Sequence, residues 1–172
     1  MQVLDNTTFN NLIERFRQPL TRAAYHLCGN KEASLDIVQE TLLDAYKGYH
    51  TLREQDKAGA WLYSILRRKA ISFYKAQNAE ERTINELAFL NNHNNNSSEV
   101  FDIYVEEINK LPEEDREILA GKYLLDLSYS EIAEALGIKE GAVRVRSFRA
   151  KMKLREFFSN NGSNISQKGR LV

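Results

Sequence analysis

The stretch that most constrains the fold of this chain is residues 128–158, where a short apolar-patterned segment, a glycine turn and a long basic segment follow one another. Ser130 can cap a first helix, which Gly137 can end in the left-handed conformation that glycine adopts at little cost. The inward positions of this helix are apolar: Ile132, Ala133 and Leu136. A turn over 138–141 and a second, basic helix over 142–158 complete the outline of a DNA-binding helix-turn-helix.

The second helix has two contrasting faces when its residues are placed about 100° apart. One face is small and mostly apolar: Val143, Ser147, Ala150, Leu154 and Phe157. The opposite face is cationic with apolar members between the charges: Arg144, Val145, Phe148, Arg149, Met152 and Arg155. A merely solvated face more often mixes both signs of charge. Arginines can pair with phosphates or guanine edges, and Val145 or Phe148 can meet thymine methyl groups, so the pattern favours duplex reading.

The charge of the chain is sorted along its length although the formal net charge is zero. Lys and Arg outnumber Asp and Glu by 11 to 8 in residues 1–78 and by 9 to 2 in residues 139–172. The acids lead by 7 to 2 in residues 79–110 and again in residues 111–138. Such sorting suits a protein with two nucleic-acid surfaces and an acidic part between them.

The composition argues against several classes of function. Cys28 is the single cysteine, which rules out an internal disulfide and a cysteine-cluster metal site. His93 stands alone among asparagines, and no metal or other cofactor is expected. No apolar run is long enough to span a bilayer and the N-terminus lacks a signal-peptide pattern, so we expect a cytoplasmic protein.

Two helices are predicted in the first 47 residues. Apolar residues at helical spacing cover 7–28, where Pro19 should kink or split the helix, and a second helix is expected over 31–47. The inward face of the second helix is predicted to hold Val38, Thr41, Leu42, Ala45 and Tyr46. Its reverse side carries Asp36, Gln39, Glu40, Leu43 and Lys47. This stripe fits either a solvated face or a docking surface. A catalytic pair of Asp36 and Glu40 lacks every other part of an active site.

A polar loop over 48–57 leads into a helix predicted over 58–77. Its buried side is apolar: Ala58, Trp61, Leu62, Ile65, Leu66 and Phe73. Its other side interleaves aromatic rings and cations: Tyr63, Arg67, Arg68, Ile71, Tyr74 and Lys75. Rings that stack on unpaired bases beside cations that follow phosphates are typical of single-strand binding. An ordinary amphipathic helix with tyrosines at the edge of the core explains the same pattern, and the helix alone does not decide.

The sequence therefore predicts an all-α protein of two small helical domains joined by a flexible linker. We place the N-terminal domain at 1–78 and the linker at 79–98, where the polar run NNHNNNSS cannot bury enough surface to fold. The C-terminal domain, with the helix-turn-helix, is placed at 99–160. Residues 161–172 are expected to form a disordered tail.

Three segments together resemble a known family. DIVQETLLDAY at 36–46, WLYSILRRKAISFY at 61–74 and the run from LPEEDRE to KMKLR at 111–155 are similar to the alternative bacterial sigma factors of the extracytoplasmic-function class. The order and the spacing of the segments match as well as their residues. The resemblance implies a dissociable subunit of RNA polymerase that recognises promoter DNA.

The resemblance also implies roles for individual residues. In the family, the helix matching 36–46 docks on the clamp helices of the largest polymerase subunit, so the contact residues are expected to be Asp36, Gln39, Glu40 and Leu43. The loop and helix matching 50–75 recognise and melt the −10 element, with a flipped base held in part by the loop. The expected −10 contacts are Thr51, Leu52, Arg53, Tyr63, Arg67, Arg68, Tyr74 and Lys75. The expected −35 contacts are Arg144, Val145, Phe148 and Arg149 in the major groove, with Arg146 and Lys151 nearer the phosphates.

The implied partners are core RNA polymerase and promoter DNA, with no small-molecule substrate and no enzymatic activity. Many members of the class are held by an anti-sigma factor, and the sequence leaves open whether this chain has one. Two rival interpretations remain. A stand-alone helix-turn-helix regulator would bind an operator without polymerase, and an enzyme would use Asp36 and Glu40 to bind a divalent metal.

Overall fold

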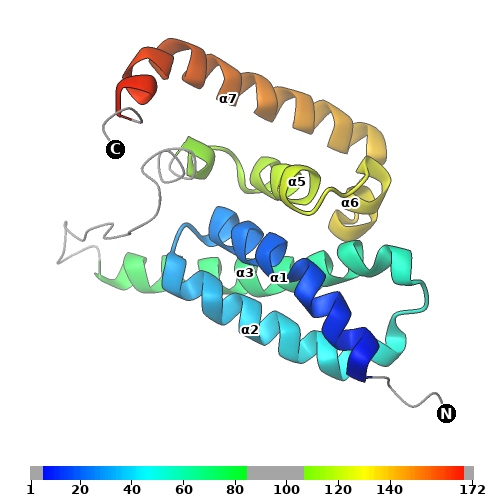
Figure 1. Cartoon of the computed structure of the whole chain (residues 1–172). Coiled ribbons are helices and arrows are strands. Elements are labelled where there is room, and N and C mark those ends of the chain that lie inside the picture. Colours follow the sequence, from blue (N-terminus) through cyan, green and yellow to red (C-terminus); the bar gives the residue numbers. More distant parts are fainter. Residues whose placement is uncertain (1–5, 85–106, 169–172) are drawn as a thin grey trace.

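The chain is described by a computed structural model that covers residues 6–84 and 107–168, with side chains placed for 8–76 and 107–160 (Figure 1). Helices and short 3-10 turns form all the regular structure of these ranges, which confirms the all-α prediction. The elements are α1 (Asn6–Cys28), α2 (Lys31–Gly48), η1 (Tyr49–Thr51), η2 (Gln55–Lys57), α3 (Ala58–Ile84), α5 (Glu113–Leu124), α6 (Tyr129–Leu136) and α7 (Glu140–Lys168).

The first three helices pack against one another around an apolar core. α1 continues through Pro19, so of the two predicted effects, a kink or a split, the split does not occur. Gly29, with φ +68°, ends α1 in the left-handed region. Asn30 then caps α2, because its side chain accepts a hydrogen bond of 3.0 Å from the backbone N–H of Ala33. The two helices therefore form a tight antiparallel hairpin, which α3 completes.

The helix-turn-helix is formed by α6 and α7, with boundaries that differ slightly from the prediction. Ser128, and not Ser130, caps α6: its side chain and that of Glu131 each bond the other's backbone N–H. Gly137 ends α6 with φ +66°, as predicted. α7 begins at Glu140, two residues earlier than expected, and extends to Lys168, beyond the predicted end of the domain.

The two groups of helices pack directly against each other. α5 lies between the N-terminal helices and α7 in Figure 1, and it contacts α1, α3 and α7. One continuous cluster of buried side chains joins Tyr63 of α3 to Ile118 of α5, to Leu127 in the segment before α6, and to Ile132 of α6. Of the linker predicted at 79–98, residues 79–84 belong to α3; the remainder, with the start of the domain predicted at 99, lies outside the described residues.

Replacement by alanine is expected to have opposite effects on stability at two glycines of the helix-turn-helix. Gly137→Ala should lower the free energy of unfolding by about 1 kcal/mol, because a Cβ is strained at positive φ even though no atom lies within 4 Å of it. Gly141→Ala, also without an atom within 4 Å, should leave stability unchanged or raise it by up to about 1 kcal/mol, since Gly141 lies in the first turn of α7. Urea unfolding of both variants measures the difference; equal effects would contradict the prediction.

Candidate partner and nucleic-acid interfaces

The exposed side of α2 carries the residues predicted to dock on a partner. These are Asp36, Gln39, Glu40 and Leu43, which we call the α2 strip. The opposite side of the helix is buried through Ile37, Val38, Thr41 and Ala45. Leu43 is 60% exposed, so the strip combines polar groups with apolar area that the chain's own core does not use.

One member of the α2 strip is oriented by α3. Lys69 of α3 lies 3.2 Å from the carboxylate of Glu40 and 2.9 Å from that of Asp44. The hydrogen bond from Lys69 lowers the pKa of Asp44, and the two carboxylates together raise the pKa of Lys69. α2 and α3 thus hold the Glu40 side chain in one direction along the surface.

Two further apolar side chains extend the α2 strip. Leu35 is 49% exposed and Tyr46 is 54% exposed. The prediction that Tyr46 points inward is wrong, although its ring makes a T-shaped contact with that of Phe9, with the centroids 5.4 Å apart. Leu35 precedes Gln39 by one helical turn, and this spacing was the signal in the sequence that could have placed it beside the strip.

The loop between α2 and α3 borders an open pocket of about 440 Å³. Thr51 and Arg53 are exposed there, and Leu52 is half-buried against the core. The hydroxyl of Thr51 donates to the carbonyl of Gly48 at 2.7 Å, which fixes the turn. The full lining is Thr51, Leu52, Arg53, Glu54, Lys57, Ala60, Trp61, Ser64, Glu131, Glu134 and Ala135. The last three belong to α6, so both groups of helices form this pocket.

The predicted platform on α3 is divided between solvent and α5. Arg68 and Lys75 are exposed. The prediction that Tyr63 is exposed is wrong: it is 0% exposed, and its hydroxyl donates to the backbone carbonyl of Glu117 at 2.5 Å. The Arg67 side chain is only 25% exposed, with Nε 2.9 Å from a carboxylate oxygen of Glu117. Helical periodicity could not predict this contact, because α5 lies far from α3 along the chain.

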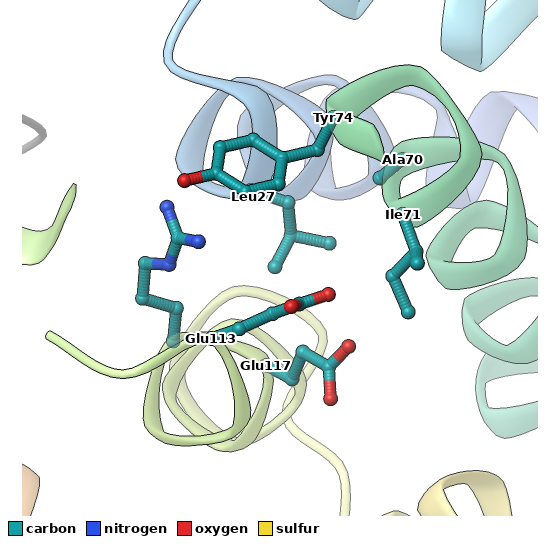
Figure 2. Close-up of a pocket in the computed structure, with 7 residues that line it drawn as sticks. Leu27, Ala70, Ile71, Tyr74, Glu113 and Glu117 are labelled. Carbon is teal, nitrogen blue, oxygen red and sulfur yellow. The ribbon is translucent and has the colours of Figure 1, made fainter. Parts of the chain in front are cut away.

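Tyr74, the second tyrosine of the predicted single-strand platform on α3, also lies next to α5. Figure 2 shows Ile71 of α3 directed toward α5, where Glu113 and Glu117 lie, while the ring of Tyr74 extends sideways above Leu27. The guanidinium of Arg116 lies 5.2 Å from the centroid of the Tyr74 ring. α3 and α5, together with Leu27 of α1, line a pocket of only about 10 Å³ here, so little space is left between them.

The faces predicted for the second helix of the helix-turn-helix agree with the structure of α7. Val143, Ser147 and Ala150 are buried against the rest of the domain. The exposed side carries Arg144, Val145, Phe148, Arg149 and Lys151, which we call the α7 face. Phe148 is 66% exposed and Val145 is 52% exposed. Apolar groups therefore stand among cations on a surface that solvent reaches, as direct reading of base edges requires.

Two arginines of α7 are held by acidic partners. Arg144 donates through Nε to Glu140 at 3.0 Å, and its guanidinium lies 5.0 Å from the Tyr129 ring centroid. Such contacts orient the side chain before any ligand binds. Arg146 is half-buried and forms an ion pair with Glu114 of α5, so its position differs from that of its exposed neighbours.

Burial at the contact of α5 with α1 and α3 shifts two pKa values. Burial, with a smaller contribution from the charge of Arg116, lowers the pKa of His26 to about 4. The Nε2 atom of His26 donates to the backbone carbonyl of Arg116 at 3.1 Å. Burial also raises the pKa of Glu117 although the charge of Arg67 opposes that shift. The contact therefore favours a neutral imidazole.

The described residues contain no group of three or more His, Cys, Asp or Glu side chains placed to hold a metal ion. Asp36 and Glu40, considered above as a metal-binding pair, gain no third ligand in this part of the chain. Within the same ranges, none of the helices combines the length and the apolar character that crossing a membrane requires.

Comparison with known families identifies two matching regions. The family model of Sigma-70 region 2 matches residues 12–80, and that of Sigma-70, region 4 matches residues 101–154. The first range contains the α2 strip, the loop and most of α3. The second contains α5, α6 and the part of α7 that carries the α7 face.

Individual relatives match most of the chain. RNA polymerase sigma factor SigV of Bacillus subtilis is 30% identical over 135 residues, which cover 78% of this chain and 81% of the relative. The ECF RNA polymerase sigma-E factor of Haemophilus influenzae is 28% identical over 162 residues, covering 86% and 85%.

Solved structures share the fold across both groups of helices. The sigma factor RpoE of Bartonella quintana, in complex with the anti-sigma factor NepR, matches with a TM-score of 0.74 and 21% identity, covering 89% of this chain and 98% of that one. CnrH in complex with the cytosolic domain of CnrY matches with a TM-score of 0.69 and 22% identity, covering 92% of each chain.

Proposed function

Because the chain belongs to the extracytoplasmic-function class of RNA polymerase sigma factors, it directs RNA polymerase to promoters, and we propose how its surfaces divide that work. The α2 strip binds core RNA polymerase, the loop and α3 capture unpaired bases of the −10 element, and the α7 face reads the −35 element as duplex. A stand-alone DNA-binding regulator is not favoured. The N-terminal helices match Sigma-70 region 2, and a regulator that acts without polymerase would have no use for that region.

The observation that carries the −35 assignment is the α7 face. Arg144, Val145, Phe148 and Arg149 are exposed on a helix whose opposite side is buried. A helix of this kind can enter the major groove and present its cations to guanine and its apolar groups to thymine methyls. Lys151, farther along the exposed side, contacts phosphate, and Arg146 is released from Glu114 to do the same.

The −10 assignment rests on the pocket at the loop and on the composition of α3. Thr51, Leu52 and Arg53 border a pocket of about 440 Å³, which supports capture of a base taken out of the stack. Arg67, Arg68, Tyr74 and Lys75 supply a ring and cations for the adjoining strand, whereas Tyr63 is fully buried and takes no part in this proposal. Opening DNA costs roughly 1–2 kcal/mol per base-pair step, and stacking contacts worth roughly 1–3 kcal/mol per base offset that cost.

Docking on polymerase allows the weak binding of the −10 element and that of the −35 element to act together. Once the α2 strip holds the chain on core polymerase, both DNA-binding surfaces stand near their elements at a raised effective concentration. One of the solved relatives is a complex with the anti-sigma factor NepR, and we extend that class of partner to this chain as a competitor for the same surfaces.

Two variants of the α7 face separate base contacts from phosphate contacts. On promoters that the polymerase–sigma complex selects from genomic DNA, Arg149→Ala should weaken binding of the −35 duplex by about 1–3 kcal/mol and relax the preference at one base position. Lys151→Ala should weaken all sequences alike and reduce the slope of log affinity against log salt by about 1. Fluorescence anisotropy with single-base variants of the duplex measures both effects.

Two outcomes of these measurements would contradict the proposed roles of Arg149 and of α7. If Arg149→Ala weakens every duplex equally, Arg149 is a phosphate contact. If both variants bind as the wild type does, α7 does not read the −35 element.

A further inference from the structure

Arg144, near the start of α7, is held along one edge by an acid of its own helix. A single carboxylate oxygen of Glu140, Oε1, accepts hydrogen bonds from both Nε and Nη2 of Arg144, at 3.0 and 2.5 Å. The Arg144 side chain nevertheless stays 61% exposed. Its Nε–Nη2 edge is therefore occupied, whereas its Nη1–Nη2 edge has no partner among the residues that the structure describes.

The plane of the Arg144 guanidinium is held by an aromatic ring from α6. Its Cζ atom lies 5.0 Å from the centroid of the Tyr129 ring, and Nζ of Lys122 lies 5.3 Å from the same centroid. Tyr129 is the first residue of α6 and packs against the core of the chain. Lys122 is fixed in turn, because it donates to the backbone carbonyl of Leu127 at 3.1 Å. The ring is thus a firm platform for the guanidinium.

These two contacts limit what Arg144 can offer to DNA. An arginine reads guanine by placing two N–H groups against the O6 and N7 atoms of the base. Because Glu140 already engages Nε, the pair that remains for a base is Nη1 and Nη2. The first residues of a recognition helix are the ones that contact base edges, and Arg144 is the fifth residue of α7. The arrangement therefore leaves one defined fork of donors for the groove.

Stability alone explains Glu140 poorly. The ion pair between Glu140 and Arg144 is largely exposed, with side-chain exposures of 40% and 61%, and such pairs contribute little to folding. An acid in the first turn of a helix suits the helix dipole, but it also brings negative charge to the end of α7 that would approach phosphates, which lowers affinity for DNA. Orientation of Arg144 accounts for an acid at this place and for the stacking on Tyr129 together.

We propose that Glu140 and Tyr129 are specificity-determining positioning residues, which hold Arg144 so that it reads one guanine of the −35 element through its Nη1–Nη2 edge. The inference rests on the proposed −35 role of the α7 face. Ordering a long side chain on binding costs free energy, and that cost is already met here for the one geometry that suits guanine. Glu140 and Tyr129 therefore raise the preference for guanine at a single base position.

Two substitutions of Glu140 separate orientation from charge. Glu140→Ala and Glu140→Gln remove the same charge, but only glutamine keeps an oxygen that accepts from Arg144. The polymerase–sigma complex is given pairs of promoters that differ at one −35 base, and competition binding measures its preference. Arg144→Ala identifies the position that Arg144 reads. At that position Glu140→Ala should lower the preference for guanine about two- to tenfold, as the cost of ordering one side chain implies, and Glu140→Gln should keep most of it.

The charge control is Glu156→Gln, the same substitution at an exposed residue farther along α7. Loss of a negative charge should tighten binding of all promoters alike in this variant and in both Glu140 variants. It should not change the preference for guanine in Glu156→Gln. A double variant, Glu140→Ala with Arg144→Ala, should show no further loss of preference beyond Arg144→Ala, because Glu140 acts through Arg144.

A second pair of variants tests the platform. Tyr129→Leu keeps an apolar group against the core and removes the ring, so it should lower the preference for guanine at the same base position by a similar factor. Tyr129→Phe keeps the ring and should retain the wild-type preference. If Tyr129→Phe loses as much preference as Tyr129→Leu, the ring is not the platform and the inference is wrong.

The Glu140 variants have equally definite outcomes. Loss of preference in Glu140→Ala with retention in Glu140→Gln supports positioning. Equal preferences in the two variants would show that Glu140 acts through its charge alone, and a change at a different base position would show that Glu140 reads a base itself; either result overturns the inference. If Arg144→Ala leaves the preference unchanged at every −35 position, the proposed role of Arg144 is wrong, and the inference falls with it.

Discussion

A chain in which Gln39, Glu40 and Leu43 are all changed to alanine is expected to lose its association with core RNA polymerase while it stays folded. The three side chains are exposed on α2, and Leu43 supplies the apolar area that central interface residues provide. Loss of such residues costs at least about 2 kcal/mol each when they lie at the centre of an interface. Binding should therefore weaken by well over about 100-fold, as measured by co-purification and by biolayer interferometry with core polymerase.

The fold should tolerate this triple change. Glu40 shares Lys69 with Asp44, which remains to pair with it, and exposed ion pairs contribute little to stability. The control is a triple alanine variant of the exposed α1 residues Glu14, Arg17 and Gln18, which should bind polymerase as the wild type does. Retained co-purification of the α2 variant, or equal losses in both variants, would show that the α2 strip is not the docking surface.

Acidification should destabilise the folded chain through His26 by roughly 3 kcal/mol between pH 7 and pH 3.5. The pKa of this imidazole is about 4 in the folded state, against the ordinary 6.5. The unfolded chain therefore takes up the proton first, and the stability that His26 contributes is complete above pH 6.5 and is lost as the pH falls toward 4. Glu117 acts in the opposite direction, because its raised pKa makes the folded state take up a proton more readily.

A comparison with His26→Gln isolates the contribution of the imidazole. Glutamine keeps a side-chain N–H donor for the carbonyl of Arg116 and does not titrate in this range. Urea unfolding at a series of pH values should give a shallower loss of stability for the variant than for the wild type over the window from pH 6.5 to 4. Parallel curves would mean that His26 does not stay neutral in the folded chain.

Local periodicity and turn chemistry predicted much of this structure because they act within a few residues. The faces of α7 followed from helical spacing alone, and Val143, Ser147 and Ala150 are buried as expected. Gly137 ends α6 for the reason anticipated. The sequence analysis predicts Ser130 as the cap of α6, although Ser128 stands three residues before Glu131 in the spacing of a capping box. The sequence therefore contained the signal for the correct cap, and the prediction gave it too little weight.

The placement of Tyr63 and Arg67 could not be predicted in the same way. Periodicity separates the two sides of α3 but does not say which distant segment covers either side. The covering residue, Glu117, lies 54 positions beyond Tyr63, across a long polar stretch. Pro19 shows a different limit: its effect on a helix depends on packing around α1, where Leu20, Ala23 and Ala24 are fully buried and hold the helix in place.

Run-off transcription on genomic DNA with purified core RNA polymerase, with and without this protein, tests most directly whether the chain gives polymerase its promoter specificity. Addition of the protein should produce a set of discrete transcripts whose start sites share two upstream sequence elements at a constant spacing, and core polymerase alone should produce none of them. Identical transcripts with and without the protein, accompanied by tight binding of the protein alone to particular duplex sites, would contradict the account and favour a stand-alone regulator.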